Sequence, residues 1–114
     1  MIKLNLKFLI SKILTSLFFC VACLSHAGEW TQSGKVTQIY PKPSRDGVYI
    51  KHEFMLSNGC SNNSFLFLYA NQSLYKEIYT LLVASYHSSK NVRIFLEGCQ
   101  TGANYPLIKE VIAD

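Results

Sequence analysis

Hydrophobic and polar residues alternate along several segments of the chain after residue 28. The clearest alternation runs through residues 47–57, where one face carries Val48, Ile50, His52, Phe54 and Leu56. Such alternation is typical of a β-strand with one buried face. Residues 64–70 are apolar on both faces, as a central strand would be. With shorter stretches at 35–40, 92–97 and 107–113, the pattern predicts five strands.

The hydrophobic period changes after the third predicted strand. Apolar residues then recur at steps of three and four, at Leu74, Tyr75, Ile78, Tyr79, Leu82 and Tyr86. This spacing predicts an amphipathic helix of about four turns that ends near residues 88–91, with Asn71 or Ser73 as the cap for its free amides. The tyrosine stripe is interpreted as the face packed on the sheet, with a subunit interface as the alternative.

The predicted order of elements is β-β-β-α-β-β, a mainly β fold with one helix. This is the order of a five-stranded OB-fold-like barrel, whose helix lies between strands three and four. A ferredoxin-like sandwich would need a helix directly after strand one, where residues 41–47 form a turn instead. We therefore expect residues 28–114 to form one OB-fold-like domain.

The first 27 residues have the three parts of a secretory signal peptide. A basic start is followed by an apolar centre at residues 13–24, which falls short of the about 20 residues that span a bilayer. Small residues then precede a predicted cleavage between Ala27 and Gly28. A lipoprotein cut before Cys23 and an uncleaved anchor are the alternatives. We expect a secreted or periplasmic protein with no membrane span after cleavage.

Removal of this leader changes the charge of the protein. The formal net charge is +4, but three of the 11 Lys and Arg residues lie in the leader, which leaves 8 basic against 7 acidic side chains. A net charge of +1 provides no general attraction for phosphates, so we expect no nucleic-acid partner.

The mature chain holds two cysteines, Cys60 and Cys99. In an oxidising compartment we interpret them as one disulfide, which closes a loop of roughly 40 residues and stabilises the fold by about 4 kcal/mol. Two buried free thiols are the alternative. His52 and His87 are not at zinc-ligand spacing from the cysteines, so we predict no metal site.

The mature sequence carries no motif for catalysis. Its glutamates are scattered singly, at Glu53, Glu77, Glu97 and Glu110, and form no pair suited to acid–base chemistry. A phosphate-binding loop is absent from the sequence as well. We therefore predict a non-enzymatic protein with no catalytic residues and no cofactor. His52 is interpreted either as a partly exposed strand residue or as a member of a binding pocket.

Several short motifs are spread over residues 29–112. They are Glu29-Trp30-Thr31, Ser33-Gly34-Lys35-Val36, Asn58-Gly59-Cys60-Ser61, Leu74-Tyr75, Asn91-Val92-Arg93-Ile94 and Asn104-Tyr105-Pro106-Leu107. Together they resemble the B subunits of subtilase cytotoxin and typhoid toxin, in the pertussis-like group of toxins. The resemblance implies an OB-fold that assembles as a pentameric ring and binds sialylated glycans on host cells.

The resemblance also implies binding residues. In the family, a serine near the start of strand one contacts the acid group of the sugar, and Ser33 stands at the matching position. Its hydroxyl can donate to a carboxylate. The predicted glycan-binding residues are Ser33, His52 and Glu53. The strand-two cysteine of the family is replaced by Ile50, so the resemblance gives Cys99 the role of partner to Cys60.

The expected function is that of a secreted, non-enzymatic binding subunit. It would recognise a host glycan or glycoprotein as a homo-oligomeric ring, with a toxin A subunit as a candidate partner. One alternative is a periplasmic or secreted OB-fold binding or inhibitor module with a protein partner. Another is a small secreted structural protein without a ligand.

Overall fold

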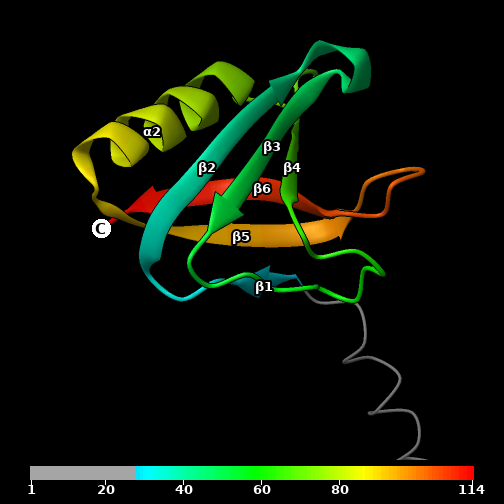
Figure 1. The fold of residues 1–114 in the computed structure, drawn as a ribbon, viewed down its shortest axis with the longest axis horizontal. Helices are drawn as coiled ribbons and strands as arrows, with labels where there is room; N and C mark the ends of the chain where they lie inside the picture. The colour runs from blue at the N-terminus through cyan, green and yellow to red at the C-terminus, as the bar shows by residue number, and fades with distance from the viewer. Residues whose placement is uncertain (1–27) are drawn as a thin grey trace, which may run out of the picture.

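Six strands and one α-helix build residues 28–114, the part of the chain that the structure, a computed structural model, describes (Figure 1). The elements are β1 (Glu29–Trp30), β2 (Gly34–Lys42), the 3-10 helix η1 (Pro43–Arg45), β3 (Gly47–His52), β4 (Leu66–Tyr69), α2 (Tyr75–Ser88), β5 (Asn91–Cys99) and β6 (Pro106–Ala113). The mainly β class with one helix is confirmed. The predicted signal peptide, with Ala27 of its cleavage site, lies outside the described residues.

The strands pair in a ring. β2 pairs with β3, β3 with β4, β4 with β6, β6 with β5, and β5 again with β2. Every pairing is antiparallel except that of β4 with β6, where Phe67 lies opposite Leu107. The short β1 adds to β5, so the observed order is β-β-β-β-α-β-β. The predicted order lacked this first strand, because two residues are too few to give a period.

β1 and the start of β2 lie along the same edge of β5, with a break between them. Trp30 lies opposite Phe95, and Gly34 lies opposite Val92. The buried Thr31 fills the break: its backbone N–H donates to the carbonyl oxygen of Ile94 at 2.8 Å, and its Oγ1 accepts from the N–H of Ile94 at 3.0 Å. The threonine side chain therefore takes the place of a backbone carbonyl in the ladder.

The core lies inside the ring, under α2. Its fully buried members come from facing strands and from the helix: Val48, Ile50, Leu66, Leu68, Leu82, Val92, Ile94, Leu96 and Ile108. α2 contacts β2, β6 and β5, and its side chains Ile78 and Leu82 close this end of the core (Figure 1). The predicted inward face of residues 47–57 is thus confirmed for Val48 and Ile50.

The predicted strand at 47–57 is wrong in its second half, because β3 ends at His52. The Nδ1 of His52 accepts a hydrogen bond from the N–H of Phe54 at 3.1 Å, and the sulfur of Met55 accepts one from the N–H of His52 at 3.4 Å. These local bonds bend the chain out of the sheet. Phe54, expected in the core, is therefore exposed.

The predicted helix is confirmed, but its predicted cap is not. Neither Asn71 nor Ser73 caps α2; the N-cap is Leu74, in a left-handed conformation with φ of 60° and no side-chain cap bond. The backbone closes this end instead, because the N–H of Tyr75 donates to the carbonyl oxygen of Gln72. Within residues 28–114, no helix is long and apolar enough to cross a membrane.

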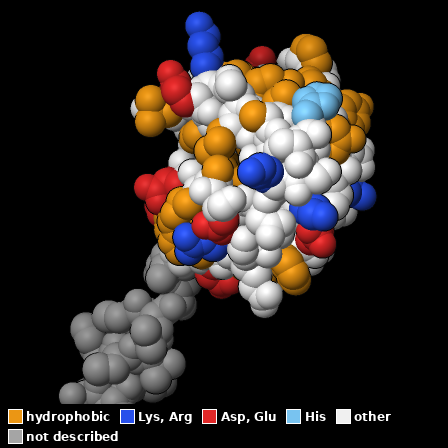
Figure 2. Space-filling view, turned by 90° about the vertical axis from the view of Figure 1, so that its left-hand side faces the viewer, with side chains coloured by type: hydrophobic (Ala, Val, Ile, Leu, Met, Phe, Trp, Pro, Cys, Tyr) orange, Lys and Arg blue, Asp and Glu red, His pale blue; other side chains and the backbone are white. Residues whose placement is uncertain are grey.

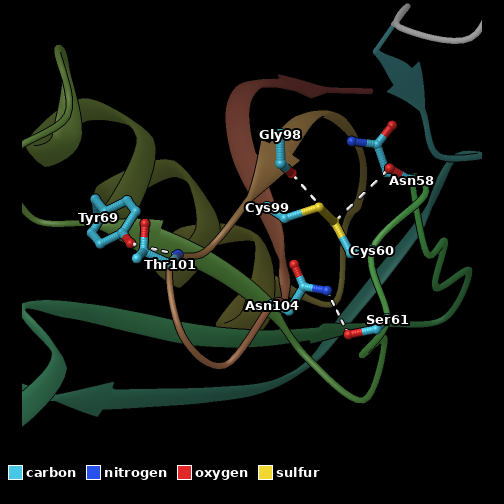
Figure 3. The surroundings of a disulfide bond; sticks show 8 residues. All are labelled: Asn58, Cys60, Ser61, Tyr69, Gly98, Cys99, Thr101 and Asn104. Atoms are coloured by element: carbon cyan, nitrogen blue, oxygen red, sulfur yellow. Dashed lines mark hydrogen bonds between the residues drawn. A yellow bond between two sulfur atoms is a disulfide. The ribbon is translucent and has the colours of Figure 1, made fainter.

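The disulfide between Cys60 and Cys99 is confirmed, with 5.8 Å between the two Cα atoms (Figure 3). It joins the loop before β4 to the end of β5. Two hydrogen bonds support the same junction: Asn104 Nδ2 donates to Ser61 Oγ, and the N–H of Asn62 donates to the carbonyl oxygen of Asn104. The disulfide therefore anchors the base of the loop at 99–105, which carries Asn104.

The role of Thr31 gives the first testable prediction. Thr31→Val keeps the shape of the side chain but leaves the N–H of Ile94 without its acceptor, so the free energy of unfolding should fall by about 1–3 kcal/mol. Urea unfolding measures this change. The control is Thr37→Val, at an exposed position of β2, which should change the free energy by less than about 0.5 kcal/mol. Equal effects of the two substitutions would contradict the role given to Thr31.

The disulfide gives the second prediction. Replacing both Cys60 and Cys99 by alanine removes the constraint on the unfolded chain, so the free energy of unfolding should fall by about 4 kcal/mol at most. Urea unfolding of the double variant beside the oxidised protein measures the loss. Chemical reduction of the unchanged protein should produce a similar loss, and an unchanged midpoint in both cases would contradict the prediction.

Candidate functional site

The three residues predicted to bind glycan lie in one corner, where β2 begins and β3 ends. Glu53 and Lys35 join the two strands: the N–H of Lys35 donates to Glu53 Oε1 at 2.7 Å, and the N–H of Glu53 donates to the carbonyl oxygen of Lys35 at 3.0 Å. Ser33 and Glu53 are exposed, whereas His52 is only 3% exposed. The three residues chosen from the sequence are therefore neighbours in the structure, but His52 is shielded from solvent whereas Ser33 and Glu53 are not.

His52 is a structural residue in this corner. Its Nε2 donates to the carbonyl oxygen of Val92 at 3.0 Å, while its Nδ1 accepts from the N–H of Phe54 at 3.1 Å. A neutral ring with its proton on Nε2 satisfies both bonds. Both ring nitrogens are therefore engaged within the protein, and the imidazole ties the end of β3 to β5.

Ser33 belongs to a small polar cluster with Arg93 and Asp114. The guanidinium of Arg93 donates two hydrogen bonds to the Asp114 carboxylate, from Nε to Oδ2 at 3.1 Å and from Nη2 to Oδ1 at 3.3 Å. The hydrogen bonds from Arg93 and then from the Ser33 hydroxyl lower the pKa of the Asp114 carboxyl. The cluster thus holds a carboxylate at the surface between β2, β5 and the end of β6.

Trp30 extends this cluster with an aromatic surface. The guanidinium carbon of Arg93 lies 6.0 Å from the ring centroid of Trp30, and the Phe95 ring packs on the same indole at 5.2 Å. The indole is 40% exposed, an unusual position for so large an apolar ring. We call Trp30, Ser33, Arg93 and Asp114 the Trp30 corner.

A shallow groove continues from the Trp30 corner along β6. Its lining includes Trp30, Leu74 and Ile112, and Lys109 and Glu110 supply its charges. Leu74, at the start of α2, is the most exposed large apolar side chain among the described residues. The groove therefore offers apolar and polar contacts beside the indole, on a surface open to an extended ligand.

Sequence reasoning missed the rest of the Trp30 corner. Trp30 and Arg93 both stand within the motifs that carry the resemblance, but the sequence offers no sign that they meet. They come together because Trp30 pairs opposite Phe95, two residues along β5 from Arg93. The contact of Asp114 with Arg93 depends likewise on the pairing of β5 with β6.

Charges of both signs are spread over the surface of the molecule on the α2 side. Figure 2, which faces the α2 side of the molecule, shows Lys, Arg, Asp and Glu side chains scattered among hydrophobic ones. Residues 28–114 hold no cluster of three or more His, Cys, Asp or Glu side chains that could bind a metal ion.

Comparison with protein-family models finds no match to this chain, and comparison with curated proteins finds none either.

The pKa of Asp114 gives the third prediction. Because its folded-state pKa is below the ordinary 3.8, its bonds stabilise the fold above the unfolded pKa, and this contribution is lost as the pH falls through the folded-state value. A carboxyl-carbon NMR titration should give a midpoint below 3.8 for Asp114. Arg93→Gln should raise that midpoint, and Ser33→Ala should raise it by less. A midpoint unmoved by Arg93→Gln would contradict the assignment.

Proposed function

We propose that residues 28–114 form an OB-fold-like barrel that serves as an exported, non-enzymatic, glycan-binding subunit. The ring of strand pairings supports the barrel, because the parallel pairing of β4 with β6 brings the third and fifth long strands together. The position of α2 between the third and fourth long strands supports it as well. In this proposal β1 and β2 are two parts of the first barrel strand, separated by the break at Thr31.

The observation that carries the glycan proposal is the Trp30 corner. A sugar ring presents an apolar C–H face and a rim of hydroxyls, so its sites combine an exposed aromatic ring with fixed polar groups. Trp30 supplies the ring, and Arg93 and Asp114 supply planar donors and acceptors beside it. The groove along β6 gives room for further sugar units.

The same corner can accept an acidic sugar. A guanidinium has five N–H donors, of which Asp114 takes two. The remaining donors are available to a sugar carboxylate. The negative charge of Asp114 repels such a second carboxylate and so weakens its binding. Binding of sialylated glycans would therefore engage Arg93 first, and would gain Ser33 as a donor only where the sugar replaces Asp114.

One such site binds weakly, because each hydrogen bond contributes only about 0.5–1.5 kcal/mol net. Assembly of several copies compensates, since linked sites raise avidity by about 10²–10⁴-fold. We therefore propose that the chain acts as a homo-oligomer, a pentameric ring by the resemblance, on a host glycan or glycoprotein. A toxin A subunit is the partner that such a ring would carry.

A glycan array of the mature, oligomeric protein tests this function and gives the fourth prediction. The unchanged protein should bind a defined set of glycans, and Trp30→Ala and Arg93→Gln should each reduce the signal by roughly tenfold, because each removes a direct contact. Ser33→Ala should weaken acidic glycans more than neutral ones. Native mass spectrometry of each variant reports whether the oligomer persists.

The matched controls lie on α2 and in the turn after it. Tyr86→Ala removes an aromatic ring that is 41% exposed, close to the exposure of Trp30, and Lys90→Gln removes one positive charge. Neither should change the array signal as long as native mass spectrometry shows the oligomer intact. A silent array with a well-folded oligomer would reject the glycan function, and equal losses in the controls would move the site away from Trp30.

A further inference from the structure

A second cluster of aromatic side chains covers the outer face of β3 and β4. The ring of Tyr49 lies at its centre, 5.3 Å from that of Phe65, 4.9 Å from that of Phe67 and 5.2 Å from that of Tyr105. Tyr40 on β2 extends the cluster, with its ring centroid 6.0 Å from that of Tyr49. We call these five residues the aromatic face.

We propose that the aromatic face is a second carbohydrate site, specific for anionic glycans that carry sulfate or carboxylate groups. The inference rests on the proposed function in one respect, since both assign carbohydrate as the ligand. It concerns other residues and a different surface, because no member of the Trp30 corner contributes to it.

Two lysines lie directly on the aromatic face. Lys42 Nζ is 5.9 Å from the ring centroids of both Tyr40 and Tyr49, and Lys51 Nζ is 4.9 Å from the centroid of Phe65. The lysine stems are held half-buried against the rings. Because each lysine side chain is already held against a ring, it loses less conformational entropy on binding an anion than a free surface lysine does.

The charge around the aromatic face is positive. Arg45 and Asp46, in the turn between β2 and β3, add one charge of each sign. The bordering loops at residues 57–64 and 99–105 carry no charged residue. This surface therefore holds a net charge of +2 in a mature chain whose total is +1, so its field favours an anionic ligand over a neutral one.

A buried acceptor without a donor lies at the edge of the aromatic face. Gln100 is 4% exposed, and its Oε1 has no hydrogen-bond partner among residues 28–114. Its Nε2 makes one long bond, of 3.5 Å, to the hydroxyl of Tyr49. A buried amide oxygen left unpaired costs about 1–3 kcal/mol, so a hydroxyl-bearing ligand that reached it would gain this bond.

The loop after Gln100 is closed by two backbone bonds, from the N–H of Gln100 to the carbonyl oxygen of Tyr105 at 2.7 Å and from the N–H of Asn104 to the carbonyl oxygen of Gln100 at 3.0 Å. The disulfide anchors Cys99, and the N–H of Thr101 donates to the hydroxyl of Tyr69 at 3.3 Å (Figure 3). Gly102 in the same loop has a φ of 92° and open space around it. Because the two backbone bonds hold Gln100 and Asn104, a ligand would reach the Gln100 amide only through a movement of the loop tip at residues 101–103.

The aromatic face suits sugar rings better than nucleic-acid bases. Base stacking needs several open ring faces, whereas Phe67 is fully buried and Tyr49 nearly so. Tyr40, which is 44% exposed, offers the most open ring, and the tyrosine hydroxyls offer polar contacts around it. One open ring surrounded by hydroxyls, an amide and two ammonium groups matches a single anionic sugar unit.

Calorimetry with heparin, a sulfated glycan, tests the inference on the mature protein and is the fifth prediction. The double variant Lys42→Gln/Lys51→Gln should weaken binding by roughly tenfold or more, because charge-assisted bonds are lost. Tyr40→Ala should weaken it as well. The control is Lys76→Gln/Lys90→Gln, which removes the same two charges from α2 and the turn after it, and which should change the Kd by less than about twofold.

Gln100→Met separates a binding role from a structural one. The substitution removes the unpaired amide and keeps a flexible side chain of similar length, so the midpoint of urea unfolding should stay equal or rise. Heparin binding should fall at the same time. A fall in both quantities, or an unchanged affinity with a stable fold, would remove Gln100 from the proposed site.

The remaining variants separate the two sites and the two classes of ligand. Arg93→Gln, which disrupts the Trp30 corner, should weaken heparin binding less than Lys42→Gln/Lys51→Gln does. If Arg93→Gln abolishes it and the Lys42/Lys51 pair does not, the anionic sugar binds at the Trp30 corner alone, and this inference is overturned while the proposed function stands. Tighter binding of single-stranded oligo(dT) than of heparin would also overturn it. An absence of heparin binding beside a positive glycan array has the same consequence.

Discussion

Backbone hydrogen bonding along both edges of β5 is the constraint on which the rest of the structure depends. One edge pairs with β6 and the other with β1 and the start of β2. The break in this second edge is bridged by the side chain of Thr31, and the carbonyl oxygen of Val92 receives the bond from His52. Because three strands and the end of β3 converge on β5, a change in its register would displace all of them.

Both proposed binding surfaces take their geometry from these strands. Arg93 lies on β5, and Trp30 is held beside it by the pairing of β1 with β5 and by the bonds of the next residue, Thr31. The hydrogen bonds along β5 therefore fix the geometry of the Trp30 corner. Three members of the aromatic face lie on β2, β3 and β4, whose pairing sets Tyr40 opposite Tyr49 and Tyr49 opposite Phe67. Side chains fixed in this way lose little further conformational entropy when a ligand binds.

The sequence allowed prediction of the features that depend on local pattern or simple counting. The helix followed from apolar spacing, and the disulfide followed from two cysteines in an expected oxidising compartment. The end of β3 could not be read in this way, because alternation continues to Leu56 while the ring of His52 bends the chain. The Trp30 corner was equally inaccessible, since residues 30 and 93 meet only through strand pairing.

The position of the disulfide would link the proposed aromatic site to the redox environment of the protein. Cys99 immediately precedes Gln100, and the bond to Cys60 is the covalent anchor of the loop that borders the aromatic face. In a reducing compartment the chain would carry two thiols, and this loop would be held by hydrogen bonds alone. Oxidation therefore adds a covalent anchor beside the proposed second surface, to a loop that backbone hydrogen bonds also close.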